Sequence, residues 1–323
     1  MNIQLSVVIP TYRRPELLLN CLRAVYTQRF AAGAFEIIVV SDGADPLSEK
    51  AVTAFNKHRA LPVQYYALPA KKGPAAARNY GWLLAKGALI VFTDDDCQPA
   101  NNWLCSYYER FVTDKSKVFT GKTIVPLPAC PTDYERNVAH LEEADFITAN
   151  CACSKRILLA TGGFDEQFAT AWREDSDLEF KLIKAGIWIE KVESAVVTHP
   201  VRTAKWGVSI KEQKKTMYNA LLYKKWPELY RQKIQPNPPV YYYATLSFFL
   251  LMPAGGLLKT PLLITAGLTG WLALSVFFAF RRLKFTSRKP RHLLEMAVTS
   301  LLIPFLSVYW QFYGAFKYRV LFL

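Results

Sequence analysis

Three consecutive carboxylates, Asp94, Asp95 and Asp96, directly follow the apolar run ALIVF (88–92). Adjacent acids repel one another, and a carboxylate buried without a partner is strongly destabilising, so these acids need a positive partner. Two alternate carboxylates on a turn, here Asp94 and Asp96, can share one hard divalent cation. Mg²⁺ and Mn²⁺ prefer such oxygen ligands, and Mg²⁺ often keeps phosphate oxygens in its shell. The pattern therefore indicates a metal site that holds a diphosphate, with a solvated acidic turn as the simpler alternative.

A second acidic cluster, Glu174, Asp175 and Asp177, opens the stretch WREDSDLEFKLIKAG (172–186). Leu178, Leu182 and their neighbours follow at helical spacing, and acids in the first turn suit the helix dipole. This stretch is predicted to be a helix that begins with a group of carboxylates.

The elements that must position these acids alternate along the first hundred residues. Short apolar runs bounded by turn signals predict strands, and segments with helical spacing lie between them. The predicted strands are 5–10, 35–43, 62–68 and 88–96, and the predicted helices are 16–28, 46–59 and 73–87. Such alternation predicts βαβ units in a mostly parallel sheet, whose ligands bind beyond the carboxyl ends of the strands. Thr11 and Tyr12, Asp42 and the three aspartates are therefore expected to converge on one crevice.

Several other classes of protein are disfavoured by what the sequence lacks. No GxGxxG follows the first strand and no GxxxxGK[ST] occurs, which argues against dinucleotide oxidoreductases and P-loop enzymes. The N-terminus has no basic region before its short apolar run, so no signal peptide is expected. Six cysteines without a CxxC pair are interpreted as reduced cytosolic thiols, and a metal role for Cys151 and Cys153 is the less favoured alternative.

Six motifs occur in an order typical of one enzyme family. They are SVVIPTYRRPELLLNCL (6–22), EIIVVSDGA (36–44), GPAAARNYG (73–81), FTDDD (92–96), GGFDE (162–166) and REDSDLEFKL (173–182). Together they resemble the family-2 inverting glycosyltransferases, whose α/β fold is called GT-A. The resemblance covers about the first 200 residues. It implies a Rossmann-like, mostly parallel sheet, a nucleotide-diphosphate-sugar donor and a divalent metal, Mn²⁺ or Mg²⁺.

The resemblance also implies roles for individual residues. Those on the donor side are Pro10, Thr11 and Tyr12 in the nucleotide loop, Asp42 at the base, Arg78 and Asp95 in the donor site, Asp94 near the ribose and Asp96 on the metal. Asp94 is expected to share that metal. His199, at the end of a strand predicted over 187–201, fits either a further metal ligand or a structural role.

On the acceptor side, Asp175 matches the catalytic base, and Glu174 and Asp177 are interpreted as supporting residues. Inverting transfer to a hydroxyl requires a carboxylate that takes the acceptor's proton, while a metal stabilises the departing diphosphate. The alternative is that these three acids only cap a helix. Gly163, Phe164 and Asp165 resemble the family's acceptor-side loop, although the glycines are equally explained by a tight turn.

The last third of the chain has a different composition. From residue 200 onward there are 18 Lys and Arg against three Asp and Glu, compared with 22 against 23 before it. Three long apolar runs, 240–258, 260–280 and 293–316, are each close to the length that spans a bilayer, although the third contains Glu295 and Pro304. A buried helical hairpin of a soluble domain is the alternative. Because only Lys259 separates the first two runs, a re-entrant hairpin is also possible.

Charges near the apolar runs predict how the chain meets the membrane. The basic stretch RRLKFTSRKPRH (281–292) favours a cytosolic position for this loop. A connector helix over 211–233 is expected to lie on the anionic cytosolic surface. Its apolar face would consist of Met217, Tyr218, Leu221, Leu222 and Trp226.

The sequence thus predicts a GT-A domain over 1–200, a basic amphipathic connector over 201–238 and membrane-embedded helices over 239–323. The predicted function is metal-dependent, inverting sugar transfer from a nucleotide-diphosphate sugar to a hydroxyl of a lipid-linked or cell-surface glycan. A UDP-sugar is favoured and a GDP-sugar is possible, since Asp42 suits either base. The expected location is the inner membrane, with membrane lipids but no nucleic acid as partners.

Two alternative functions stay open. One is a polyprenyl-phosphate glycosyltransferase, whose acceptor is a phosphate that needs little help from a base. The other is an inactive nucleotide-sugar-binding scaffold, which the intact acids disfavour. The Gln-x-x-Arg-Trp signature of processive members does not follow the acids at 174–177. Addition of a single sugar is therefore favoured over synthesis of a polymer.

Overall fold

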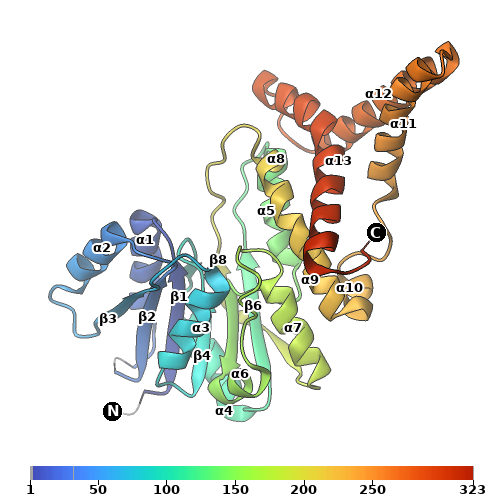
Figure 1. Cartoon of the computed structure of the whole chain (residues 1–323). Helices are drawn as coiled ribbons and strands as arrows, with labels where there is room; N and C mark the ends of the chain where they lie inside the picture. The colour runs from blue at the N-terminus through green and yellow to red at the C-terminus, as the bar shows by residue number, and fades with distance from the viewer. Residues whose placement is uncertain (1–2, 32, 323) are drawn as a thin grey trace. The chain divides into compact units, whose positions relative to one another are not determined.

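The computed structural model describes residues 3–31 and 33–322 of the chain (Figure 1). It consists of two compact units. The first comprises the residues up to Pro126 together with Ala139–Val201, and the second comprises Leu127–Val138 together with the residues from Arg202 onward. The short segment Leu127–Val138 thus leaves the first unit between two of its strands and packs within the second.

Eight strands of the first unit form one mixed sheet in the order β3-β2-β1-β4-β7-β6-β8-β5. The strands are β1 (Leu5–Thr11), β2 (Phe35–Ser41), β3 (Val63–Ala67), β4 (Leu89–Thr93), β5 (Gln98–Pro99), β6 (Val118–Ile124), β7 (Asn150–Ser154) and β8 (Ile189–Thr198). β3, β2, β1 and β4 pair in parallel, as the sequence predicted. β7 runs antiparallel to both β4 and β6, β6 is parallel to β8, and β5 is antiparallel to β8.

Helices cover both faces of this sheet, and the alternation of side chains along each strand supplies both cores. In β1, Val7 and Ile9 belong to one buried cluster and Val8 to the other. The first cluster includes residues of α1 (Pro15–Tyr26), α2 (Pro46–Asn56) and α4 (Trp103–Thr113). The second includes residues of α3 (Pro74–Leu84), α6 (Lys155–Thr161) and α7 (Glu174–Lys184). The strands and helices predicted within the first unit are all present, with ends that differ from the prediction by no more than three residues.

A buried asparagine joins the strands of the second half of the sheet. The side chain of Asn150 in β7 donates hydrogen bonds of 3.0 Å to the carbonyl oxygens of Lys122 in β6 and Ala195 in β8. Its carbonyl oxygen accepts a 2.7 Å hydrogen bond from the hydroxyl of Tyr107. These bonds fix β8, which leads into His199.

The second unit is helical. Its elements are α5 (Asp133–Ala139, shared at its last residue with the first unit), α8 (Val208–Glu212), the 3₁₀ helix η2 (Gln213–Thr216), α9 (Met217–Lys225), α10 (Pro227–Lys233), α11 (Val240–Leu257), α12 (Pro261–Leu283) and α13 (Pro290–Tyr318). A further 3₁₀ helix, η1 (His140–Glu143), lies in the first unit.

The prediction of one amphipathic connector helix is wrong. The segment 211–233 is broken into four short helical pieces, and Trp226 lies in the break before Pro227. Proline has no backbone N–H and restricts the residue before it, which explains the interruption. Met217 and Leu221 are buried, and the backbone of Met217 lies against Gly314 of α13. The apolar face of α9 is therefore covered by protein instead of being left for lipid.

Three helices, α11, α12 and α13, are long and apolar enough to cross a membrane among the described residues. Only 11% of the apolar window of α11 and 17% of that of α12 is buried within the chain, so a soluble hairpin does not account for them. Glu295 and Pro304 do not interrupt α13, which runs over 29 residues. The exposed apolar surface of these helices indicates membrane association.

Glycines let α11 and α12 approach closely. A Cβ on Gly267 would lie 2.8 Å from the carbonyl oxygen of Phe248, and one on Gly270 would lie 2.3 Å from the Phe248 ring. Contacts between small residues and the facing backbone are typical of helices that associate within membranes. This packing is consistent with a hairpin that spans the bilayer and equally with a re-entrant one.

A buried arginine holds the inserted segment within the second unit. Arg282, at the end of α12, forms a 2.7 Å ion pair with Asp133 of α5. It also donates hydrogen bonds to the hydroxyl groups of Thr299, Ser300 and Ser209. The Arg282 guanidinium therefore binds groups from segment 127–138, α8 and α13 and connects them to α12.

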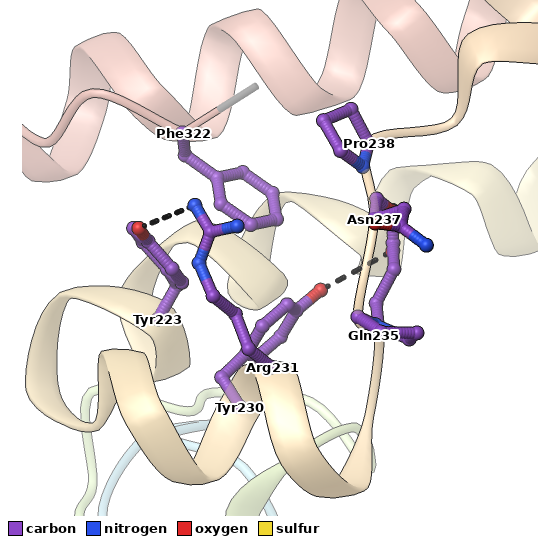
Figure 2. Close-up of a pocket in the computed structure, with 8 residues that line it drawn as sticks. Tyr223, Tyr230, Arg231, Gln235, Asn237, Pro238 and Phe322 are labelled. Carbon is purple, nitrogen blue, oxygen red and sulfur yellow. Dashed lines mark hydrogen bonds between the residues drawn. The ribbon is translucent and has the colours of Figure 1, made fainter.

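A small aromatic pocket lies where α9 and α10 meet the C-terminal residues (Figure 2). The rings of Tyr223, Tyr230 and Phe322 contact one another with centroid distances of 5.2–5.6 Å. Arg231 lies over the Tyr223 ring and donates a 3.0 Å hydrogen bond to its hydroxyl. These contacts hold α9, α10 and Phe322 together.

Candidate functional site

The three aspartates follow β4 and differ sharply in exposure. The side chain of Asp94 is 26% exposed, whereas those of Asp95 and Asp96 are 3% and 1% exposed. Because β1, β2 and β4 are parallel neighbours, the residues that follow them lie at the same edge of the sheet. Thr11, Asp42 and the three aspartates are thus brought to one edge, as the alternation of strands and helices indicated.

Asp95 holds the loop after β1. Its carboxylate accepts a 2.8 Å hydrogen bond from the hydroxyl of Thr11 and a 3.1 Å hydrogen bond from Arg14. Burial raises the pKa of Asp95 to about 6, and the nearby Arg14 guanidinium opposes this rise. Arg14 had no role in the sequence analysis, although it lies in the motif that contains Tyr12. Both groups that bond Asp95 come from that motif.

The nucleotide loop itself is buried at its start and partly exposed at Tyr12. Pro10 and Thr11 are buried at the end of β1. The ammonium of Lys71 lies 4.1 Å from the centroid of the Tyr12 ring, and the Arg13 guanidinium lies 5.1 Å from it. Two cations therefore lie beside the Tyr12 ring at this edge of the sheet.

Asp42 fixes the loop that leads into α3. Its carboxylate accepts hydrogen bonds of 2.7 and 2.8 Å from the backbone N–H groups of Lys72 and Gly73. Gly73 has a φ of +101°, and a Cβ there would lie 2.6 Å from the backbone of Ala169. Only glycine satisfies both constraints.

Arg78 joins the two acidic clusters. Its side chain is 2% exposed, and it contacts Asp94 at 2.6 Å and Glu174 at 3.2 Å. Burial alone would lower the pKa of Arg78, but the two carboxylates hold it above its usual range. The guanidinium therefore stays charged and neutralises acids that would otherwise repel each other.

The acids at the start of α7 also differ from one another. Glu174 is buried, and its pKa is raised to about 7. Burial is the main cause of this rise, the charge of Asp175 adds to it, and the charge of Arg78 opposes it. Asp177 is buried and forms a 3.4 Å ion pair with Lys181. Asp175 is partly exposed, and its carboxylate accepts a 2.7 Å hydrogen bond from the N–H of Ser176. Of the three, Asp175 is the acid that an acceptor could reach most readily.

Within the described part of the chain, Asp96, Cys97 and His199 form a group that could hold a metal. One ligand atom from each lies within 4.8 Å of the other two, and His199 Nε2 lies 3.7 Å from an Asp96 oxygen. The Nδ1 atom of His199 is buried and has no hydrogen-bond partner among the described residues, and the backbone N–H of His199 donates to the carbonyl oxygen of Ile124. A carboxylate oxygen suits Mn²⁺ and Mg²⁺, whereas an imidazole nitrogen suits transition-metal ions. Burial raises the pKa of the Cys97 thiol well above its ordinary value, which makes it a weak ligand.

The loop that contains Gly163, Phe164 and Asp165 packs against β4 and α3. The Phe164 ring packs edge-on against Phe92 of β4 at 5.3 Å, and the Arg78 guanidinium lies 5.7 Å from its centroid. The backbone of Phe164 is hydrogen-bonded to Asn79, which lies in the motif GPAAARNYG and for which the sequence predicts no role.

Comparison with known proteins identifies this domain. Residues 6–154 match the family described as Glycosyl transferase family 2. Among solved structures, the mannosyltransferase PcManGT from Pyrobaculum calidifontis with GDP-Man and Mn²⁺ has a TM-score of 0.57 at 18% identity, covering 93% of this chain and 87% of that one. GalNAc-T7 with UDP, GalNAc and Mn²⁺ has a TM-score of 0.56 at 17% identity, covering 76% and 51%. Residues 6–154 thus form a glycosyl transferase family 2 domain, and the first unit has the GT-A fold.

Curated relatives in sequence are glycosyltransferases and synthases. A chondroitin synthase from Escherichia coli is 26% identical over 278 residues, covering 71% of this chain and 39% of that protein. A pre-mycofactocin glycosyltransferase from Mycobacterium tuberculosis is 32% identical over 189 residues, covering 52% and 38%. The chain thus spans less than two fifths of the length of either relative.

The raised pKa of Glu174 predicts a pH-dependent stability. An acid whose pKa is higher in the folded state stabilises the fold while protonated, and this contribution is lost as the pH rises from 4.5 to about 7. Wild type should therefore lose stability relative to Glu174→Gln over this range, as measured by thermal unfolding in EDTA. Asp114→Asn is the control. Because the pKa of the partly exposed Asp114 is lowered, the difference in stability between this variant and wild type should stay constant over the same pH range. A constant difference for Glu174→Gln as well would contradict the prediction.

Proposed function

We propose that this chain transfers a sugar from a nucleotide-diphosphate sugar to a hydroxyl acceptor, with inversion and with a divalent metal. The observation that carries the proposal is the Asp94–Arg78–Glu174 bridge. It links the acids after β4 directly to α7, which begins at Glu174 and contains Asp175. A donor-side metal site and an acceptor-side base on one rigid support are what such a transfer needs.

On the donor side, Asp96 and His199 would hold the metal, with Asp94 as a further ligand. When bound, Mn²⁺ or Mg²⁺ would supply positive charge to the departing diphosphate. Lys71 and Arg13, beside Tyr12, would add positive charge from the chain itself. Asp42, which orders the loop before α3, suits a uracil or a guanine equally, so the donor is a UDP- or GDP-sugar.

On the acceptor side, Asp175 would accept the proton of the attacking hydroxyl. Glu174 and Asp177 are each engaged by a cation, which suits supporting roles. Partial exposure of Asp175 supports its role as the base, because the acceptor must come within hydrogen-bond distance of it. The acceptor is proposed to be a lipid-linked or cell-surface glycan, since three apolar helices accompany the domain.

The membrane helices also support an orientation. Segment 127–138 binds Arg282, which lies next to the basic loop between α12 and α13. The same segment follows residues 1–126 directly, with no membrane-spanning helix between them. We therefore infer that this loop and the transferase domain lie on the same, cytosolic side of the cell membrane. The excess of Arg and Lys in the loop agrees with this orientation.

Nucleotide binding provides the first test. Wild type should be stabilised by UDP or GDP in the presence of Mn²⁺, by about 2.7 kcal/mol at a hundred times the dissociation constant. Asp96→Asn should abolish this thermal shift, since it removes a charged ligand while keeping the side-chain shape. Asp114→Asn, at the partly exposed position that follows α4, is the matched control and should keep the shift. An equal shift for wild type in EDTA would rule out the metal's role.

The base is tested by turnover. Asp175→Asn should keep nucleotide affinity while release of nucleotide from the sugar donor falls roughly 10²–10⁴-fold. The neighbouring variant Asp177→Asn serves as a control for general damage to α7 and should retain more activity. Near-normal turnover of Asp175→Asn would mean that the base lies elsewhere or that the acceptor is already an anion, such as a polyprenyl phosphate.

Thiol labelling tests the orientation. Lys259→Cys and Arg288→Cys each place a thiol at an exposed position in a Cys130→Ser background. A membrane-impermeant maleimide should label position 259 in intact cells and position 288 only after permeabilisation. Labelling of both from one side would instead indicate a re-entrant hairpin of α11 and α12.

A further inference from the structure

Asn79 lies next to Arg78 on α3 and uses its whole hydrogen-bonding capacity. Its oxygen accepts hydrogen bonds from the Phe164 N–H at 3.0 Å and the Trp82 indole N–H at 2.9 Å. Its amide nitrogen donates to the Phe164 carbonyl oxygen at 2.9 Å and to Glu166 at 3.0 Å. A side-chain amide has two donors and two acceptor lone pairs, and all four are satisfied here.

The loop that Asn79 holds packs tightly against α3. Gly163 has a φ of +61°, and a Cβ there would lie 2.8 Å from both the Asn79 oxygen and the Trp82 ring. Any other residue at this position would have to displace the asparagine or the indole. The glycine is therefore required by the close approach of the loop to α3.

The same loop is also attached to α7. The Lys181 ammonium donates a 2.7 Å hydrogen bond to the carbonyl oxygen of Gly163 and forms an ion pair with Asp177 one turn earlier. The first turn of α7 is thus connected to α3 twice. One connection runs directly from Glu174 to Arg78, and the other runs through Lys181 and the loop to Asn79.

We propose that Asn79 is a positioning residue for the base Asp175. It fixes loop 163–166 against α3, the helix whose Arg78 binds Asp94. Because Lys181 binds the same loop, Asn79 also fixes the first turns of α7 against α3. This inference rests on the proposed function and deepens it. Asn79 contacts neither donor nor acceptor in this role, so its loss should impair the chemical step and spare nucleotide binding.

The chain offers a matched control. Asn56 of α2 makes the same kind of two-way bond to a backbone, donating to the Val63 carbonyl oxygen at 2.9 Å and accepting from the Val63 N–H at 2.8 Å. It joins α2 to β3 and has no link to α7. Asn79→Asp and Asn56→Asp each replace two donors by a carboxylate that faces a carbonyl oxygen, so both should lower the melting temperature.

The two variants are compared in the full chain in detergent by three measurements. These are amide hydrogen exchange, affinity for UDP and GDP with Mn²⁺, and release of nucleotide from a UDP- or GDP-sugar with water as the acceptor. Asn79→Asp should speed exchange in residues 162–168 and 174–181 and lower nucleotide release by about 10²-fold, since a small misplacement has effects of that size. Its nucleotide affinity should stay unchanged. Asn56→Asp should speed exchange near residues 57–65 alone and keep nucleotide release.

If Asn79→Asp fails to fold, Asn79→Ala takes its place, because it removes the four bonds without adding a repelling charge. Unchanged exchange in 174–181, or nucleotide release equal to that of the Asn56 control, would overturn the positioning role. Failure of the proposed function gives a different result, since the wild type would then bind neither nucleotide with Mn²⁺. In that case the exchange data still decide whether Asn79 holds the start of α7.

Discussion

The organisation of the transferase domain depends on how the repulsion among several neighbouring carboxylates at one edge of the sheet is balanced. Six acids, Asp94–Asp96, Glu174, Asp175 and Asp177, would repel one another strongly in a buried setting. Several different side chains neutralise these acids or donate hydrogen bonds to them. Arg78 bridges Asp94 and Glu174, Arg14 and Thr11 bind Asp95, and Lys181 pairs with Asp177. Asp96 faces His199 across a gap that suits a shared cation.

The sheet order makes this arrangement possible. Because β1, β2 and β4 are parallel neighbours, three strand ends deliver their polar residues to one edge, while β7 turns the chain back and β6 pairs with β8. α3 and α7 pack in the same buried cluster on one face of the sheet. Arg78 can therefore reach the start of α7, and Asn79 can reach the loop that Lys181 of α7 also binds, without leaving the core. A rigid support of this kind holds reacting groups in place more accurately than loops alone.

Polar contacts organise the second unit in a comparable way. Arg282 gathers α5, α8, α12 and α13 around one buried charge, and glycines allow α11 and α12 to pack closely. The inserted segment 127–138 leaves the first unit between β6 and β7, so the two units are linked by three chain crossings instead of one. This linkage is absent from the predicted linear order of domain, connector and membrane helices.

Local spacing in the sequence was enough to predict the parallel strands, the acids that end them and the three apolar helices, because each depends on residues close together in the chain. The order of the motifs gave the family resemblance, and the resemblance in turn gave the candidate base. The connector prediction failed because spacing cannot reveal that α13 covers the apolar face of α9. The two partners of Arg78, the approach of His199 to Asp96 and the role of Asn79 likewise came only from the tertiary structure. Arg78 and Glu174 are 96 residues apart, and Thr11 and Asp95 are 84 apart. Which cation neutralises which acid is decided by packing between distant segments, and no local pattern encodes it.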